Sequence, residues 1–109
     1  MNIFYLDSSA VESAKMHCDK HVVKMIVEYA QLLSTAHRVL DGEMYIDSSS
    51  GRKIKRWQHP DADFEDNLYK ACFVKHPSAI WVRKSPWNYN WLQLLWHHLC
   101  EEYTYRYDK

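Results

Sequence analysis

The chain of 109 residues has the size of one domain built around a single hydrophobic core, and it is too short for two such cores. Hydrophobic residues make up 47% of the sequence and aromatic residues 15%, with only two Gly and three Pro, a composition that excludes disordered and fibrous proteins. Fourteen basic residues balance fourteen acidic ones, which argues against sequence-independent coating of nucleic acid but allows a local basic patch.

The predicted elements are mostly helices. After an extended arm over residues 2–6, Asp7, Ser8 and Ser9 offer capping oxygens for a first helix. The second helix is expected to end at residues 41–42, because Gly tolerates the left-handed conformation that is common after a helix C-terminus. Apolar periodicity and capping signals predict helices over residues 9–17, 19–40, 63–73 and 79–82, and from residue 85 toward the C-terminus.

Between the second and third predicted helices the composition changes. Two short arms, residues 43–47 and 52–57, flank the Ser/Gly-rich residues 48–51, a pattern typical of a β-hairpin or a mobile loop. We therefore predict an all-α fold class: residues 1–109 form one helical domain, a single compact bundle of three to four helices with a small inserted β-hairpin.

The second predicted helix has an apolar row and a polar row. The apolar row, expected in the core, consists of Val22, Ile26, Tyr29, Leu33, Ala36 and Leu40, widened by Val23, Val27 and Ala30. The polar row consists of His17, His21, Lys24, Glu28, Gln31 and Thr35. Imidazoles titrate near neutral pH, an amine can hold an anion, and a carboxylate can orient an imidazole or act as a base.

The polar row is therefore a candidate catalytic face. The candidate catalytic residues are His17, His21, Lys24, Glu28 and Asp19, and Lys20 is a candidate binding residue. The alternative interpretation is an ordinary solvated helix face with an internal ion pair between Lys24 and Glu28.

The second arm of the predicted hairpin is the strongest nucleic-acid signal in the chain. It contains Arg52, Lys53, Lys55, Arg56 and Trp57. Because basic side chains contact phosphate and an indole can stack on a base, we expect this arm to bind DNA or a nucleotide. The alternative is a charged loop that stays solvated and binds nothing.

Two pairs of potential metal ligands have helical spacing. His17 and His21 are four residues apart, and His97 and Cys100 are three apart. Nothing in the sequence brings the two pairs together, so we predict neither a bound metal ion nor another cofactor. The four tryptophans on predicted helices, Trp81, Trp87, Trp91 and Trp96, have apolar neighbours and are expected in the core.

Three cysteines without CxxC spacing fit a reducing cytosol better than a disulfide framework. The N-terminal residues lack the pattern of a signal peptide, and no later stretch approaches a membrane-spanning length. We expect a soluble, cytoplasmic protein with no membrane partner, and the sequence leaves its oligomeric state open.

Four sequence segments occur in an order that is also found in a known protein family. They are Asn2-Ile-Phe, Lys24 with Glu28-Tyr-Ala-Gln-Leu-Leu33, His76-Pro-Ser-Ala-Ile-Trp81, and Cys100-Glu-Glu-Tyr-Thr-Tyr-Arg-Tyr107. This order, over about two-thirds of the chain, resembles that of small phage and bacterial proteins related to the pyrimidine-dimer DNA glycosylases, the endonuclease V-like family. The chain is also similar to a group of phage proteins that carry His-Cys-Asp-Lys-His, here residues 17–21.

The resemblance implies an all-α fold, binding of duplex DNA, and cleavage of a glycosidic bond by an N-terminal amine that a carboxylate assists. Asp19 and Glu28 are the nearest candidates for that carboxylate. The best-known members expose the amine of a small residue after removal of Met, whereas Asn2 follows Met1 here, which leaves the Met1 amine. The resemblance also implies a phage protein acting in the cytoplasm of the host cell.

Three functions therefore remain open. The first is a phage-type DNA-binding protein of DNA-glycosylase-like fold, active in base-excision repair or base processing. The second is a small non-catalytic module that binds or sequesters a nucleotide or a nucleotide-derived signal, and the third is a His- or metal-dependent phosphodiesterase. A net charge of zero favours a compact nucleotide ligand over long duplex DNA.

Overall fold

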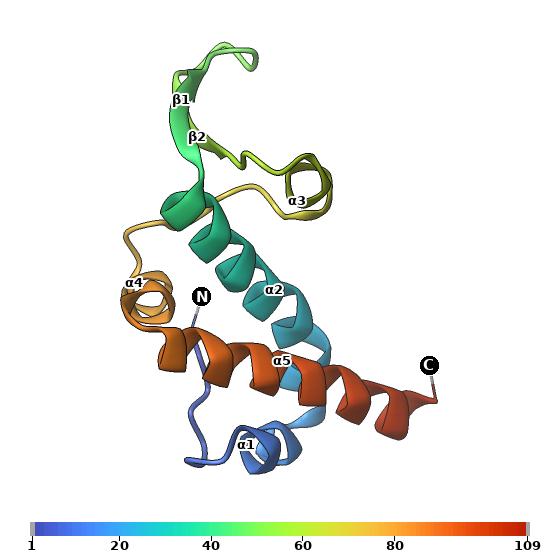
Figure 1. The fold of residues 1–109 in the computed structure, drawn as a ribbon. Helices are drawn as coiled ribbons and strands as arrows, with labels where there is room; N and C mark the ends of the chain where they lie inside the picture. The colour runs from blue at the N-terminus through green and yellow to red at the C-terminus, as the bar shows by residue number, and fades with distance from the viewer. Residues whose placement is uncertain (1, 109) are drawn as a thin grey trace.

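The computed structural model describes residues 2–108, and the fold is mostly helical with one small hairpin (Figure 1). In chain order the elements are α1 (Ala10–Met16), α2 (Asp19–Asp41), β1 (Glu43–Asp47), β2 (Ile54–Gln58), α3 (Ala62–Asn67), α4 (Pro77–Lys84) and α5 (Pro86–Tyr107). The predicted helical character is confirmed, although residues 2–108 form five helices rather than three or four. Among these helices, none combines the length and apolar character needed to cross a membrane.

The two long helices, α2 and α5, form the centre of the molecule. Helix α2 packs against α4 and α5, and α5 also packs against α1. Figure 1 shows α5 lying across α2, while the β1–β2 hairpin extends beyond the C-terminal end of α2. The hairpin and α3 therefore occupy one end of a molecule that measures 41 × 29 × 24 Å, away from the packed helices.

Local sequence signals explain most helix ends. Ser9 and Ser85 cap α1 and α5 with side-chain oxygens that accept backbone N–H groups, and Pro86 occupies the first helical position of α5. The predicted interruption between the first two helices is confirmed at His17 and Cys18, whose ψ angles of 134° and 160° are extended. The third helix ends at residue 67, six residues before its predicted end at 73.

The predicted hairpin is confirmed as an antiparallel pair in which Glu43 lies opposite Gln58. Gly51 in its turn has a φ of 86°, a left-handed value that glycine adopts without a steric penalty. Gly42 does not have the left-handed conformation that we expected, because its φ of −95° and ψ of 175° are extended. A Cβ at position 42 would instead collide with the carbonyl oxygens of Arg38 and Gln58, so glycine is required there by the close approach of α2 and β2.

The buried face of α2 is rotated from the predicted apolar row. Met25 and Leu32 are buried in the core, whereas Val23, Val27 and Leu40, which we expected there, are exposed. Because apolar residues occupy two neighbouring stripes of this helix, periodicity alone does not determine which stripe meets α5.

The four tryptophans predicted in the core divide in a similar way. Trp91 is buried, and Trp81 and Trp96 are partly buried against the core. Trp87 is exposed in the first turn of α5, so its predicted burial is wrong.

His17 is buried, with only 2% of its surface exposed, so the prediction that it shares a solvent-accessible face with His21 is wrong. The Tyr29 hydroxyl accepts a hydrogen bond from Phe4 N–H (3.1 Å) and donates one to His17 Nε2 (2.8 Å). His17 Nδ1–H in turn donates to the carbonyl oxygen of Ser13 (2.7 Å). With the imidazole neutral, this chain of hydrogen bonds joins the N-terminal arm and α1 to α2.

Burial lowers the pKa of His17 below its ordinary value of 6.5. The unfolded chain therefore binds more protons than the folded protein as the pH falls through this region, and the free energy of unfolding should decrease. Between about pH 7.5 and about pH 5.5, the free energy of unfolding should therefore fall less in His17→Gln than in the wild type. Urea unfolding at both pH values measures it, with the exposed His97→Gln as control, and an equal loss in wild type and His17→Gln would contradict the assignment.

Candidate functional site

The remaining residues of the predicted catalytic face are partly engaged in packing and ion pairs. The His21 ring stacks on Phe4, with ring centroids 4.4 Å apart. Lys24 Nζ lies 3.9 Å from Glu28 Oε2, an oxygen that is buried and has no hydrogen-bond partner within the described part of the chain. His21, Lys24 and Glu28 thus share one side of α2, without His17.

Asp19 and Lys20 lie in the first turn of α2 and are exposed. Asp19 Oδ1 accepts a hydrogen bond from Arg106 Nη1 (3.0 Å), and Arg106 also donates to the carbonyl oxygens of Lys15 and His17. Asp19 therefore helps to attach the end of α5 to the junction of α1 and α2.

The two predicted pairs of metal ligands do not converge. Both ring nitrogens of His17 have hydrogen-bond partners inside the protein, whereas His97 is exposed and its Nε2 lies 3.0 Å from Glu101. Across residues 2–108, the group of three or more potential ligands that lie close enough to share an ion consists of other residues, His37, Asp41 and His59.

The register of the hairpin separates its predicted binding residues. Lys55 and Trp57 alternate with Arg56 along β2, so they project from one face of the hairpin and Arg56 from the other. Arg56 Nε lies 4.0 Å from Asp47 Oδ2, and Arg52 and Lys53 are exposed near the turn. The basic residues thus do not form a single patch.

Lys55 and Trp57 line an open groove with a volume of about 720 Å³ between the hairpin and the irregular segment 71–76, which we call the hairpin groove. Its lining residues are Met44, Lys55, Trp57, Ala71, Cys72, Phe73, Val74, Lys75 and His76. Phe73 is 65% exposed and has a φ of 49°, a left-handed value that is uncommon for a bulky residue. Two aromatic side chains, two lysines and a histidine therefore border one cavity.

Side chains from the helices hold segment 71–76 in place. The Thr35 hydroxyl of α2 accepts a hydrogen bond from Cys72 N–H (3.2 Å), and Arg83 of α4 donates one to the carbonyl oxygen of Val74 (2.8 Å). Thr35 is fully buried, in contrast to its predicted position on the polar row. These contacts fix the backbone on either side of Phe73.

Arg38 connects α2 to the other wall of the groove and to α3. Nε donates to the carbonyl oxygen of Tyr69 (2.7 Å), Nη1 to the carbonyl oxygen of Trp57 (2.8 Å) and to Glu65 Oε2 (2.6 Å), and Nη2 to the carbonyl oxygens of Glu65 (3.2 Å) and Leu68 (3.1 Å). All five N–H groups of this buried guanidinium are thereby used.

The Glu65 carboxylate is stabilised in its ionised form. His59 N–H donates to Glu65 Oε2 (2.8 Å), and this bond and the Arg38 guanidinium lower the pKa of Glu65. Arg38 therefore has a charged partner where it leaves α2, as a buried guanidinium requires.

Sequence reasoning missed Arg38, Phe73, Lys75 and His76 as residues of the site. A lone Arg on a helix and an aromatic residue in a short irregular segment carry no periodic signal, and residues 63–73 were predicted to be helical. Comparison of the chain with protein-family models, curated proteins and solved structures finds no match. The glycosylase resemblance therefore stays a prediction, and the geometry of the hairpin groove is the main guide to function.

We expect Arg38→Ala to decrease the free energy of unfolding by about 3–5 kcal/mol, because it removes the charged partner of Glu65 and leaves several carbonyl oxygens without donors. Arg38→Lys should be intermediate, since an ammonium has only three donors and lacks the planar fork. Urea unfolding measures both changes, with Arg52→Ala in the exposed turn as control. A loss below about 1 kcal/mol for Arg38→Ala would show that the groove wall does not depend on this residue.

Proposed function

We propose that this protein binds nucleic acid that offers unpaired bases, and that the hairpin groove is the binding surface. The observation that carries the proposal is the meeting of Trp57 and Lys55 from the hairpin with Phe73 and Lys75 from segment 71–76 around one open cavity. Aromatic rings bind bases by stacking, which contributes about 1–3 kcal/mol per base, and ammonium groups bind the phosphates between them.

The polar lining of the groove agrees with this ligand. His76 Nδ1 accepts a hydrogen bond from Ser78 N–H (3.1 Å), so a neutral His76 carries its proton on Nε2, where it can donate to a base or phosphate oxygen. Arg52 and Lys53 are exposed near the hairpin turn, where they could contact phosphates of a strand that extends beyond the groove. The net charge of zero limits the number of phosphate contacts, so we expect a moderate salt dependence.

Single-stranded or locally opened DNA suits this surface better than an intact duplex, because stacking on a side chain requires a base outside the helix. The proposed setting is the host cytoplasm during phage infection, in keeping with the resemblance to phage proteins and with the free thiols of Cys18, Cys72 and Cys100. The competing proposal is that the same groove sequesters a single nucleotide. In that case a mononucleotide should bind as well as an oligonucleotide does.

Lys55→Ala should weaken binding to a fluorescently labelled oligothymidylate of about 12 nucleotides and make the dependence of log K on log salt shallower by about 0.7. Arg56→Ala is the matched control, since Arg56 projects from the opposite face of the same strand and should change binding little. Fluorescence anisotropy over a salt series measures both. Equal effects of the two substitutions would contradict binding in the hairpin groove.

Trp57→Ala and Phe73→Ala should each weaken binding with little change in this salt dependence, because they remove stacking rather than charge. Trp87→Ala, an exposed tryptophan outside the groove, is their control. Competition with a mononucleotide separates the two uses of the groove: displacement of the oligonucleotide at equal concentration would favour sequestration of a nucleotide.

We propose base excision as a second activity, supported by the packing of the N-terminal arm. Phe4 of the arm stacks on His21, which brings this arm to the side of α2 that carries Lys24 and Glu28. Glu28 offers a buried carboxylate oxygen that lies 3.9 Å from Lys24 Nζ and has no hydrogen-bond partner among the described residues, whereas Asp19 accepts a hydrogen bond from Arg106. Glu28 is thus the better candidate to assist an amine, while Met1 itself lies outside the described residues.

If the N-terminal amine displaces the damaged base from C1′ of its sugar, or condenses with the aldehyde of an abasic site with loss of water, borohydride should reduce the resulting imine and link the protein covalently to DNA that contains a pyrimidine dimer or an abasic site. Blocking the N-terminus by acetylation should abolish the linked species, and Glu28→Gln should slow its formation. Denaturing gel electrophoresis detects it. Intact DNA binding without trapping on either lesion would leave binding as the function and exclude this chemistry.

A further inference from the structure

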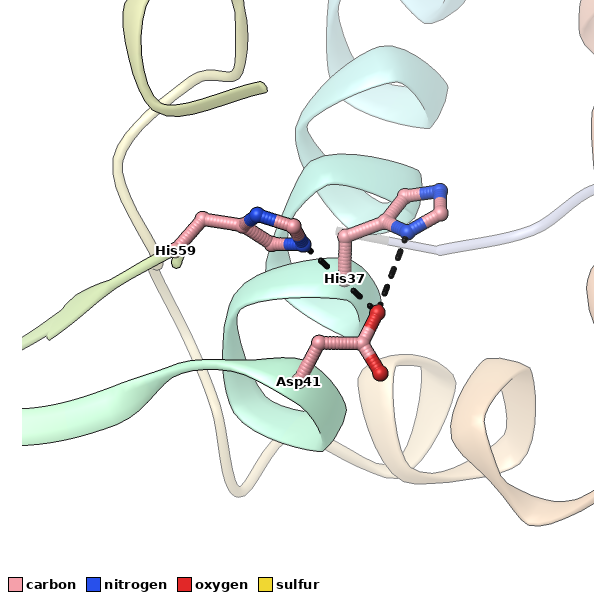
Figure 2. Close-up of side chains that lie close together, drawn as sticks. All are labelled: His37, Asp41 and His59. Atoms are coloured by element: carbon pink, nitrogen blue, oxygen red, sulfur yellow. Dashed lines mark ion pairs between the residues drawn. The ribbon is translucent and has the colours of Figure 1, made fainter. Parts of the chain in front are cut away.

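Two histidines and an aspartate meet at the base of the hairpin, outside the hairpin groove (Figure 2). His37 and Asp41 are one turn apart on α2, and His59 directly follows β2. Asp41 Oδ2 lies 3.7 Å from His37 Nδ1 and 3.6 Å from His59 Nε2, and the three atoms lie within 4.8 Å of one another. Three potential ligands from two segments therefore face a common point.

His59 gives an independent indication of a ligand. Only 6% of its surface is exposed, and its Nε2 is buried without a hydrogen-bond partner within residues 2–108. Figure 2 shows this ring directed toward the Asp41 carboxylate. A buried polar atom without a partner is unfavourable, and a bound ion would satisfy it.

The surroundings of His37 match those of a metal-ligating histidine. Its Nε2 lies 2.6 Å from the Tyr89 hydroxyl, so an Nε2–H that donates to this oxygen leaves the lone pair of Nδ1 directed toward Asp41. The ring also stacks on Phe64, with centroids 5.4 Å apart and an interplanar angle of 19°. A hydrogen bond to the second nitrogen commonly orients such a ligand.

We propose that His37, Asp41 and His59 bind a divalent transition-metal ion, with zinc as the ion that fits best. With metal–ligand bonds of about 2.0–2.1 Å, tetrahedral geometry separates ligand atoms by about 3.4 Å, close to the two separations around Asp41. Two imidazoles with a carboxylate select zinc or a related metal over calcium and magnesium, which prefer oxygen ligands.

Three protein ligands leave a fourth position open, as in catalytic zinc sites. Asp41 is exposed, and it lines a cavity of about 300 Å³ together with His37, Arg83 and Lys84. This cavity gives the ion access to water or to an anionic ligand. The proposal does not depend on nucleic-acid binding in the hairpin groove.

Metal binding requires one proton to move. Asp61 N–H donates to His59 Nδ1 (3.1 Å), so the neutral ring carries its proton on Nε2. Coordination through Nε2 places this proton on Nδ1, with no net release, so the hydrogen bond from Asp61 N–H to Nδ1 must break. Asp61 is the residue whose side chain caps α3, and its backbone N–H therefore reports on occupancy of the metal site.

Isothermal titration of the chelator-treated protein with ZnCl2 should show one equivalent bound, and titration with CoCl2 should give the intense visible absorption of tetrahedral Co2+. Asp41→Asn and His59→Ala should each weaken zinc binding by about 100-fold or more. Even the loss of a residue that only hydrogen-bonds to a metal ligand costs about 10–100-fold in affinity. Binding should also change the amide resonance of Asp61 in the wild-type protein. Thermal unfolding of each variant without metal checks that it is folded.

His97→Ala is the matched control, because this more exposed histidine is paired with Glu101 on α5, outside the proposed site. Its zinc affinity should equal that of the wild type. Loss of binding in His97→Ala, with unchanged binding in folded Asp41→Asn, would overturn the proposal, as would an octahedral Co2+ spectrum or the absence of stoichiometric binding.

Discussion

The buried guanidinium of Arg38 is the interaction on which the hairpin end of the molecule depends. It joins α2 to β2, to α3 and to the chain that follows α3, through hydrogen bonds to Trp57, Glu65, Leu68 and Tyr69. A two-stranded hairpin is at most marginally stable alone, and α3 has only six residues and none of them is buried, so neither element is held by a core of its own. Directional bonds from one side chain replace the apolar packing that stabilises the other end.

Helix α2 therefore has different tasks along its length. Its N-terminal part carries Val22, Met25 and Tyr29 into the core and forms the hydrogen-bond chain with His17. In its C-terminal part, Thr35 and Arg38 hold the two walls of the hairpin groove by hydrogen bonds to Cys72 and Trp57, and His37 and Asp41 belong to the ligand cluster. One continuous helix thus links the packed body to both of the sites that we propose.

The sequence predicted features that local signals determine, and it failed where distant segments meet. The cap at Ser85-Pro86 and the hairpin around Gly51 depend on neighbouring residues, and both are confirmed. The burial of His17 depends on Tyr29, twelve residues away, which helical spacing from His21 does not reveal. The groove residue Phe73 follows the early end of α3, and its φ of 49° has no signature in the sequence.

The absence of a side chain at Gly42 allows the hairpin to leave α2 in close contact with its last turn. The carbonyl oxygens of Arg38 and Gln58 approach this position so closely that a Cβ would force the last helical turn and the end of β2 apart. Strands β1 and β2 have five residues each and extend about 16 Å from Gly42. A small change in the angle between α2 and the hairpin therefore displaces the tip of the hairpin by a larger distance. Because the hairpin forms one wall of the hairpin groove, the width of this groove depends on the absence of a Cβ at residue 42.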